Sequence, residues 1–235
     1  MIQLSRKQVG KMSPAMQRLV GYTTTIEGLG FASSEADQYP GPGLPAILLG
    51  EGGEELLREE KEAGAKSVSS ARTLSPVVSR FKGWFIDITE RAEAGRLDGI
   101  ETANGISLAS KARDTSGWQF VETEHGYLVR AAGGKYKGWV IARDDSAKTR
   151  PEGPNLTVTP ALRLARKPTN NCHWKLILTS KGLVLEALSG KYEGWFWDFG
   201  GGDPSHEESG REVAINVLLA EKVVAGSYFA VKPAK

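Results

Sequence analysis

Tryptophan is the residue type in this chain with the clearest potential to bind a ligand. Trp84, Trp139 and Trp195 each follow a glycine at a predicted turn. An aromatic ring in such a place either covers the core or presents a flat platform to a ligand, and both interpretations stay open. Trp197 has no counterpart elsewhere and lies next to Asp198, so we expect it to be the most exposed of the six tryptophans.

Residue patterns typical of enzymes and metal sites are missing from the sequence. His125, His173 and His206 do not stand at metal-ligand spacings, and there is neither a phosphate-binding loop nor a serine-hydrolase motif. The acidic run 203–208 could bind a cation, but we expect a solvated loop, as charged loop clusters usually are. Nothing around Cys172 suggests a lowered thiol pKa. The sequence therefore predicts a non-catalytic protein with no metal and no cofactor.

The composition indicates which classes of partner and which cellular locations are expected for this protein. The chain has 235 residues with 30 basic and 28 acidic side chains, a balance that argues against a dedicated nucleic-acid binder. No apolar stretch approaches the roughly 20 residues of a membrane span. A single cysteine excludes an internal disulfide, so we expect an intracellular protein, with an organelle left open, rather than a disulfide-stabilised secreted one.

Residues 71–235 carry an internal threefold repeat. A glycine–tryptophan element recurs at intervals of 55 and 56 residues, and a Leu-Ala-x-Lys element at intervals of 56 and 55. A third element places Trp118, Trp174 and Tyr228 at equivalent positions, where we expect them in the core. The repeats are 71–125, 126–181 and 182–235.

The repeat predicts an all-β fold. Apolar and polar residues alternate over short runs, so that each repeat of about 55 residues holds about four strands. A propeller usually needs four or more blades, so we favour a β-trefoil. The third repeat stops before its last strand, and residues 74–80 supply that strand from the other end of the region. The first and last strands then lie side by side and close the ring.

Residues 1–70 show no repeat and are predicted to form an extended arm. Ser13, Pro14 and Gly21 are typical of the start and end of a short helix, and a second helix is predicted at 54–63. The Gly- and Pro-rich stretch between them blocks both helix and central strand. The basic start of the arm suits organelle targeting or contact with an acidic partner, and we favour the contact.

The repeat resembles the ricin-B-type lectin branch of the β-trefoils. The residues that carry the resemblance are Trp174-Lys175-Leu176, Leu183-Val184-Leu185, Ser189-Gly190-Lys191-Tyr192 and Asp198. It implies a sugar pocket in which an aspartate lies beside an aromatic platform. In this chain those residues would be Asp87 with Trp84, and Asp198 with Trp195 or Trp197.

The chain departs from the pattern of that family at two places. The glutamine of its Gln-x-Trp signature is replaced by Ser116, Cys172 and Gly226, and Ala142 stands in the second repeat where the other two have aspartate. Sugar binding is therefore expected only in the first and third repeats.

Two functions remain after these exclusions. The first is a non-catalytic interaction or structural subunit of a larger protein assembly, held to other subunits by residues 1–70 and one face of the trefoil. The alternative is a carbohydrate-binding module that recognises glycans through Trp84, Asp87, Trp195, Trp197 and Asp198. Nucleic acid is not an expected partner.

Overall fold

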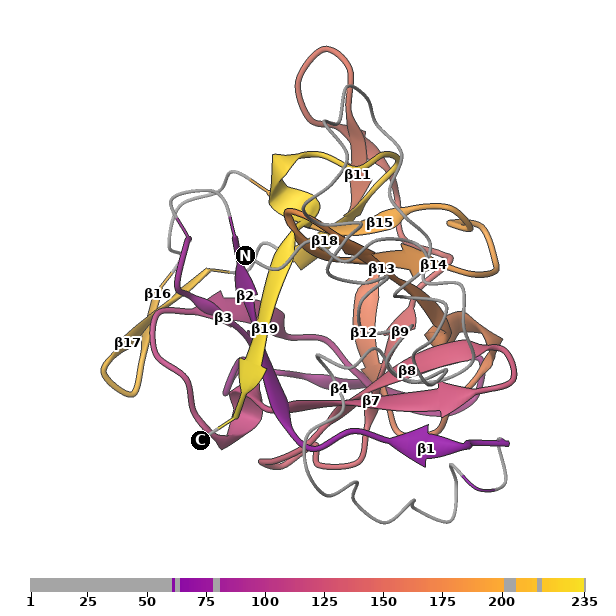
Figure 1. Ribbon diagram of the computed structural model, residues 1–235, viewed down its shortest axis with the longest axis vertical. Coiled ribbons are helices and arrows are strands. Elements are labelled where there is room, and N and C mark those ends of the chain that lie inside the picture. The colour runs from indigo at the N-terminus through magenta and orange to yellow at the C-terminus, as the bar shows by residue number, and fades with distance from the viewer. Residues whose placement is uncertain (1–60, 62–63, 78–80, 201–205, 215–216, 235) are drawn as a thin grey trace, which may run out of the picture. The chain divides into compact units, whose positions relative to one another are not determined.

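A computed structural model describes residues 61, 64–77, 81–200, 206–214 and 217–234 of the chain (Figure 1). The predicted helix at 13–21, and all of the helix at 54–63 except Lys61, lie outside the described residues. Among the described residues no helix is long and apolar enough to span a membrane.

The described part of the chain is all-β, as the repeat predicts. Its helical residues are Lys61, which is α-helical, and three single turns of 3-10 helix. The elements in the first third are β1 (Ser67–Val68), β2 (Arg72–Pro76), β3 (Phe85–Ile88), β4 (Ala94–Leu97), β5 (Ile100–Ala103), β6 (Ile106–Ala109), η1 (Asp114–Ser116) and β7 (Trp118–Thr123). Those in the second are β8 (Gly126–Ala131), β9 (Val140–Arg143), β10 (Arg150–Pro151), β11 (Thr157–Thr159), β12 (Leu162–Ala165), η2 (Asn170–Cys172) and β13 (Trp174–Thr179). Those in the last are β14 (Gly182–Ala187), β15 (Phe196–Phe199), β16 (His206–Glu208), β17 (Arg211–Ala214), β18 (Val217–Ala220), η3 (Ala225–Ser227) and β19 (Phe229–Pro233).

Six strands form a closed barrel. The antiparallel pairs run β2–β7–β8–β13–β14–β19, and β19 pairs again with β2. The two strands that close the ring lie side by side in Figure 1, one yellow and one purple. This pairing confirms the predicted closure, and it leaves no barrel strand with an unpaired edge.

Three further strand pairs repeat with the period of the sequence. They are β3–β6, β9–β12 and β15–β18. The central partners in these pairs are Ile86 and Leu108, Ile141 and Leu164, and Trp197 and Leu219. Position by position, the three units are therefore related by shifts of 55 or 56 residues.

Each repeat also extends a small hairpin onto the next repeat. The strand β5 of the first repeat pairs with β12 of the second, β11 pairs with β18 of the third, and β17 returns to β6 of the first. We call these contacts junction 1–2, junction 2–3 and junction 3–1. They link the repeats in a ring outside the barrel hydrogen bonds.

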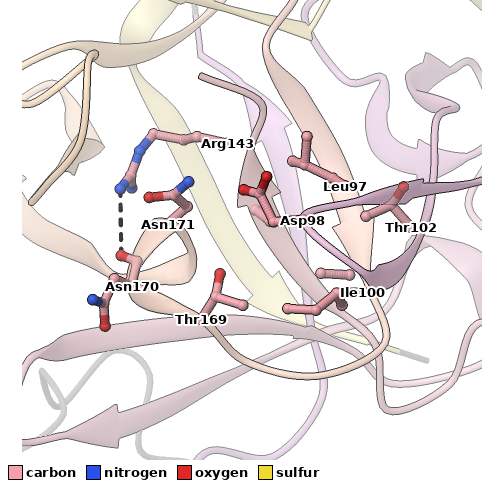
Figure 2. A pocket seen from close by; sticks show the side chains of 10 residues that line it. Leu97, Asp98, Ile100, Thr102, Arg143, Thr169, Asn170 and Asn171 are labelled. Carbon is pink, nitrogen blue, oxygen red and sulfur yellow. Dashed lines mark hydrogen bonds between the residues drawn. The ribbon is translucent and has the colours of Figure 1, made fainter. Parts of the chain in front are cut away.

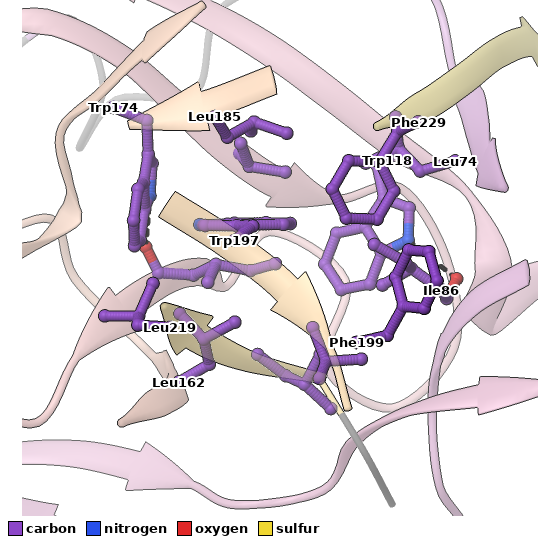
Figure 3. Close-up of a cluster of buried hydrophobic side chains, with 14 of the residues drawn as sticks. Leu74, Ile86, Trp118, Leu162, Trp174, Leu185, Trp197, Phe199, Leu219 and Phe229 are labelled. Carbon is purple, nitrogen blue, oxygen red and sulfur yellow. Dashed lines mark hydrogen bonds between the residues drawn. The ribbon is translucent and has the colours of Figure 1, made fainter. Parts of the chain in front are cut away.

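Large aromatic side chains fill the centre of the molecule (Figure 3). Trp118 and Trp174 are fully buried, and their indole N–H groups donate to the carbonyls of Ile86 (2.9 Å) and Ile141 (3.1 Å). The rings of Trp174 and Trp197 pack edge to face with centroids 5.1 Å apart. These contacts confirm the core placement predicted for Trp118 and Trp174.

The third member of this core set is Phe229 and not the predicted Tyr228. Trp118 lies opposite Arg72, Trp174 opposite Tyr127, and Phe229 opposite Leu183, so the barrel register makes Phe229 the equivalent residue. A shift of one residue along a strand turns a side chain to the other face. Phe229 is accordingly 1% exposed, whereas Tyr228 lies at the end of η3 and is only half-buried.

Candidate functional site

Trp197 is buried, so its predicted exposure is wrong. Its side chain is 0% exposed and lies among the aromatic rings in Figure 3. The pairing of Trp197 with Leu219 makes it the equivalent of Ile86 and Ile141, which are core residues of the other two units. Its position is therefore that of a core side chain and not of a ligand platform.

The turn tryptophans Trp84, Trp139 and Trp195 combine the two roles that the sequence left open. All three are half-buried and pack against the main core. Each also meets an aromatic residue three positions earlier, edge to face. The pairs are Phe81–Trp84 at 4.9 Å, Tyr136–Trp139 at 5.0 Å and Tyr192–Trp195 at 5.0 Å between ring centroids. Each indole therefore covers part of the core, while each residue keeps part of its surface accessible.

Asp87 lies inside junction 3–1. Its carboxylate is fully buried, accepts a hydrogen bond from the hydroxyl of Ser116 at 2.8 Å, and faces Nη1 of Arg211 at 2.5 Å. Burial raises the pKa of Asp87, while Arg211 and the hydroxyl of Ser116 favour its ionised form. The carboxylate expected to bind sugar thus holds β17 of the third repeat against the first.

Glu208 adds a second carboxylate to junction 3–1. It accepts hydrogen bonds from the hydroxyl of Thr89 and, at 2.9 Å, from the backbone N–H of Glu90. His206 Nε2 lies 2.7 Å from Oε1 of Glu208, the oxygen that also accepts from Thr89. Burial opposes ionisation, but these hydrogen bonds outweigh it and lower the pKa of Glu208 to about 2. The expectation of a solvated loop at 203–208 is therefore wrong for Glu208, which is 5% exposed.

Asp198 occupies the equivalent place in junction 2–3 but has no basic partner among the described residues. The hydroxyl of Ser227 donates to its carboxylate at 3.4 Å. Ser227, and not the predicted Gly226, is therefore the equivalent of Ser116 and Cys172 at the ends of the 3-10 helices. Burial, followed by the nearby carboxylate of Glu152, raises the pKa of Asp198 to about 6.

Junction 1–2 lacks the carboxylate altogether and contains a cavity. Ala142 stands at the position of Asp87 and Asp198, and a cavity of about 240 Å³ opens beside it (Figure 2). Leu97 and Ile100, from the β4–β5 hairpin, form one wall. The other lining residues are Asp98, Thr102, Arg143, Ala165, Thr169, Asn170 and Asn171.

The register explains why this junction is open. Ala103, Thr159 and Ala214 lie opposite the equivalent leucines of the next repeat. Three residues before each of them the chain has Ile100, Leu156 and Arg211. Ile100 therefore replaces the arginine that fills junction 3–1, and the space of the ion pair remains as the cavity.

Arg143 is the residue of this site that the sequence patterns did not single out. The equivalent residues in the other units are Ile88 and Phe199. The signal that could have identified it is that one repeat has a charged residue at a position where the other two repeats have apolar ones. Aligning the repeats position by position would have shown Arg143 beside Ala142 as a double departure.

The five residues that the sequence predicts as a ligand site thus lie in separate places in the structure. Asp87 and Asp198 lie in different junctions, Trp84 and Trp195 on the corresponding turns, and Trp197 in the core. The described residues contain no group of three or more His, Cys, Asp or Glu side chains placed to hold a metal ion. No protein-family model matches the chain, and a search of curated proteins finds no match.

Proposed function

We propose that residues 71–235 form a β-trefoil and that the protein is a non-catalytic interaction or structural subunit of a larger assembly. A barrel of six strands joined to three equivalent strand pairs supports the trefoil. The spacing of 55 or 56 residues between equivalent positions supports it further.

One observation carries the functional part of the proposal. The acidic groups Asp87 and Glu208 are engaged in contacts between repeats, where they hold the molecule together. What each repeat leaves accessible at its turn is part of a tryptophan ring. Tryptophan is prominent among the residues that dominate protein–protein binding energy. The turns that carry Trp84, Trp139 and Trp195 are therefore the proposed contact sites, with residues 1–70 as a further contact.

The test is the mass of the particle that contains the protein in cells that express it. A tagged full-length chain is isolated under native conditions and measured by size-exclusion chromatography with light scattering. The proposal expects a particle well above the 25.4 kDa of the chain. A variant without residues 1–60 keeps β1 and the barrel and is expected to elute as a folded monomer. A full-length monomer, or an unchanged particle after the deletion, contradicts the proposal.

A second candidate function is carbohydrate binding in the first and third repeats. The accessible parts of Trp84 and Trp195 favour it, because an indole face can stack on a sugar ring. Titration with a panel of mono- and oligosaccharides, followed by tryptophan fluorescence, tests it. A saturable change that is lost in Trp84→Ala with Trp195→Ala supports the lectin function. No change with any sugar at millimolar concentration excludes it.

A further inference from the structure

Two departures from the threefold pattern meet in the cavity of junction 1–2, beside a third position that differs from one other repeat. Ala142 and Arg143 differ in size or in charge from both of their counterparts, whereas Ile100 differs from Arg211 and matches Leu156 in size and charge. Ala142 replaces Asp87 and Asp198, Ile100 replaces Arg211 and Leu156, and Arg143 replaces Ile88 and Phe199. The first two changes remove a pair of side chains, and the third adds a cation to the wall of the space that they leave.

The cavity is open to solvent on the side of Asp98, which is exposed, and its volume is about 240 Å³. One water needs only about 10–15 Å³ of such space, so the cavity has room for more than a single water. At junction 3–1 the equivalent space is filled by Arg211 and Asp87, whose side chains are 1% and 0% exposed. Junction 1–2 can therefore hold a small molecule of about that size.

Arg143 brings a buried positive charge to the cavity. Its Nη1 donates to the carbonyl of His173 at 3.0 Å and its Nη2 to the hydroxyl of Ser189 at 2.7 Å. The carboxylates of Asp145 and Glu193 act on this charge electrostatically, but within the described chain neither lies at ion-pair distance, and the Arg143 Nε donates to no acceptor. Buried charges are normally paired. A ligand that completes the site would thus carry an anionic group.

The opposite side of the cavity carries a carboxylate and an apolar wall. Asp98 is exposed at the turn of the β4–β5 hairpin and lies across the cavity from Arg143 in Figure 2. Leu97 and Ile100 extend from the same hairpin. A ligand that fits all three must have a negative group, a positive group and a short apolar part.

We propose that the cavity of junction 1–2 binds a small zwitterion with an apolar side chain, such as a free aliphatic α-amino acid. The carboxylate of the ligand faces Arg143, its ammonium group faces Asp98, and its side chain packs on Leu97 and Ile100. Asn171 lies between the two charged residues in Figure 2 and offers an amide to either group.

The experiment titrates the full-length protein with L-valine and records amide and Arg Nε–H signals by two-dimensional NMR. Saturable shifts are expected at the Arg143 Nε–H and at the side-chain amide of Asn171. Isovalerate lacks the ammonium group and isobutylamine lacks the carboxylate, so each loses one charge-assisted hydrogen bond. Each is expected to bind about tenfold more weakly, or worse, than L-valine. Equal binding of all three, or no saturable shift with L-valine, overturns the proposal.

Two variants locate the binding in the cavity. Asp98→Asn keeps a residue that tolerates the left-handed backbone of Asp98 (φ 50°) and is expected to lower L-valine binding to the level of isovalerate. Ile100→Arg with Ala142→Asp and Cys172→Ser transplants the ion pair and hydroxyl of junction 3–1 and is expected to abolish binding. Unchanged affinity in Asp98→Asn, or in a folded triple variant, overturns the proposal.

Discussion

The buried aspartates of the first and third repeats have the same backbone position and opposite electrostatic surroundings. Asp87 faces Arg211, whereas Asp198 faces Glu152 across the equivalent junction. Burial raises the pKa of both carboxyls, but the neighbouring Arg211 favours the ionised form of Asp87, whereas the neighbouring Glu152 disfavours that of Asp198. The two residues should therefore respond in opposite directions to the same substitution.

Asp198→Asn is expected to stabilise the protein at neutral and alkaline pH. The folded-state pKa of Asp198 is raised from 3.8 to about 6, so the folded state holds this proton more tightly than the unfolded state. The contribution of Asp198 to stability is then fully present below pH 4, falls as the pH rises from 4 to 6, and is lost above 6. The substitution should remove that fall and raise the free energy of unfolding at pH 8 by about 1–3 kcal/mol. Urea unfolding across this pH range measures it, and a variant with the same slope as the wild type would contradict it.

Asp87→Asn is expected to destabilise the protein, which makes it the matched control. The substitution leaves the guanidinium of Arg211 buried with only the more distant carboxylate of Glu208, 4.0 Å away, at a cost of about 3 kcal/mol. Replacing both partners, as Asp87→Leu with Arg211→Met, should cost less than Asp87→Asn alone, because Glu208 keeps its hydrogen bonds from Thr89 and Glu90. Equilibrium unfolding of the three proteins at pH 7 decides whether the pair acts as a unit.

At the scale of elements, the barrel strands begin where the chain can approach a neighbouring backbone closely. Gly182 opens β14 with a left-handed φ of 141°, and an added Cβ would lie 2.8 Å from the carbonyl oxygen of Phe229. Gly194 also has a left-handed φ, 77°, but nothing lies within 4 Å of its Cβ position. An alanine at either position introduces backbone strain, but only an alanine at position 182 also introduces a steric contact.

Gly182→Ala is expected to destabilise the barrel more than Gly194→Ala. Both variants place a Cβ on a left-handed backbone, which costs roughly 1 kcal/mol. Only Gly182→Ala also pushes β14 away from β19, which adds about 1–3 kcal/mol. Thermal and urea unfolding give the two losses in stability. Equal losses would show that the seam between β14 and β19 tolerates the extra atom.

The sequence predicted the elements of the fold better than their register. The period of 55–56 residues is sufficient for the all-β class and for the closure of the ring, because those depend on spacing. The sequence does not distinguish Tyr228 from Phe229, because both are aromatic and adjacent, and only the partner strand tells which one faces inward. Trp197 was considered unmatched because its counterparts, Ile86 and Ile141, are not aromatic.

The candidate cavity was less accessible to prediction for a different reason. Ala142 is visible in the sequence as a missing aspartate, but Ile100 belongs to another repeat and reaches the cavity through a hairpin. The cyclic order of the junctions, in which each hairpin rests on the following repeat, has no local sequence signal. The absence of an arginine at position 100 can therefore be interpreted only when the contacts between repeats are known.

At the scale of the whole molecule, barrel closure depends on its last strand. The strand β19 pairs with β2 over five positions, from Phe229 opposite Pro76 to Pro233 opposite Arg72. It also contacts β14 on the other side. Removing it would expose two strand edges and the aromatic core beneath Phe229.

Deletion of residues 229–235 is expected to abolish cooperative folding. The control is deletion of residues 234–235, which lie beyond β19 and should leave stability within about 1 kcal/mol of the wild type. Near-ultraviolet circular dichroism and amide signal dispersion report the packed core. A sharp thermal transition in the longer deletion would show that the five remaining barrel strands fold without it.

The ring of junctions also fixes how many repeats the molecule can hold. A solenoid grows by one unit at a time, since each unit needs only a neighbour on either side. Here the third hairpin returns to the first repeat, so the number of repeats is set by the angle through which the barrel must turn. A gene duplication within the repeat region could not lengthen the structure gradually. One or two extra repeats would remain unfolded, and three extra repeats would form a second complete ring.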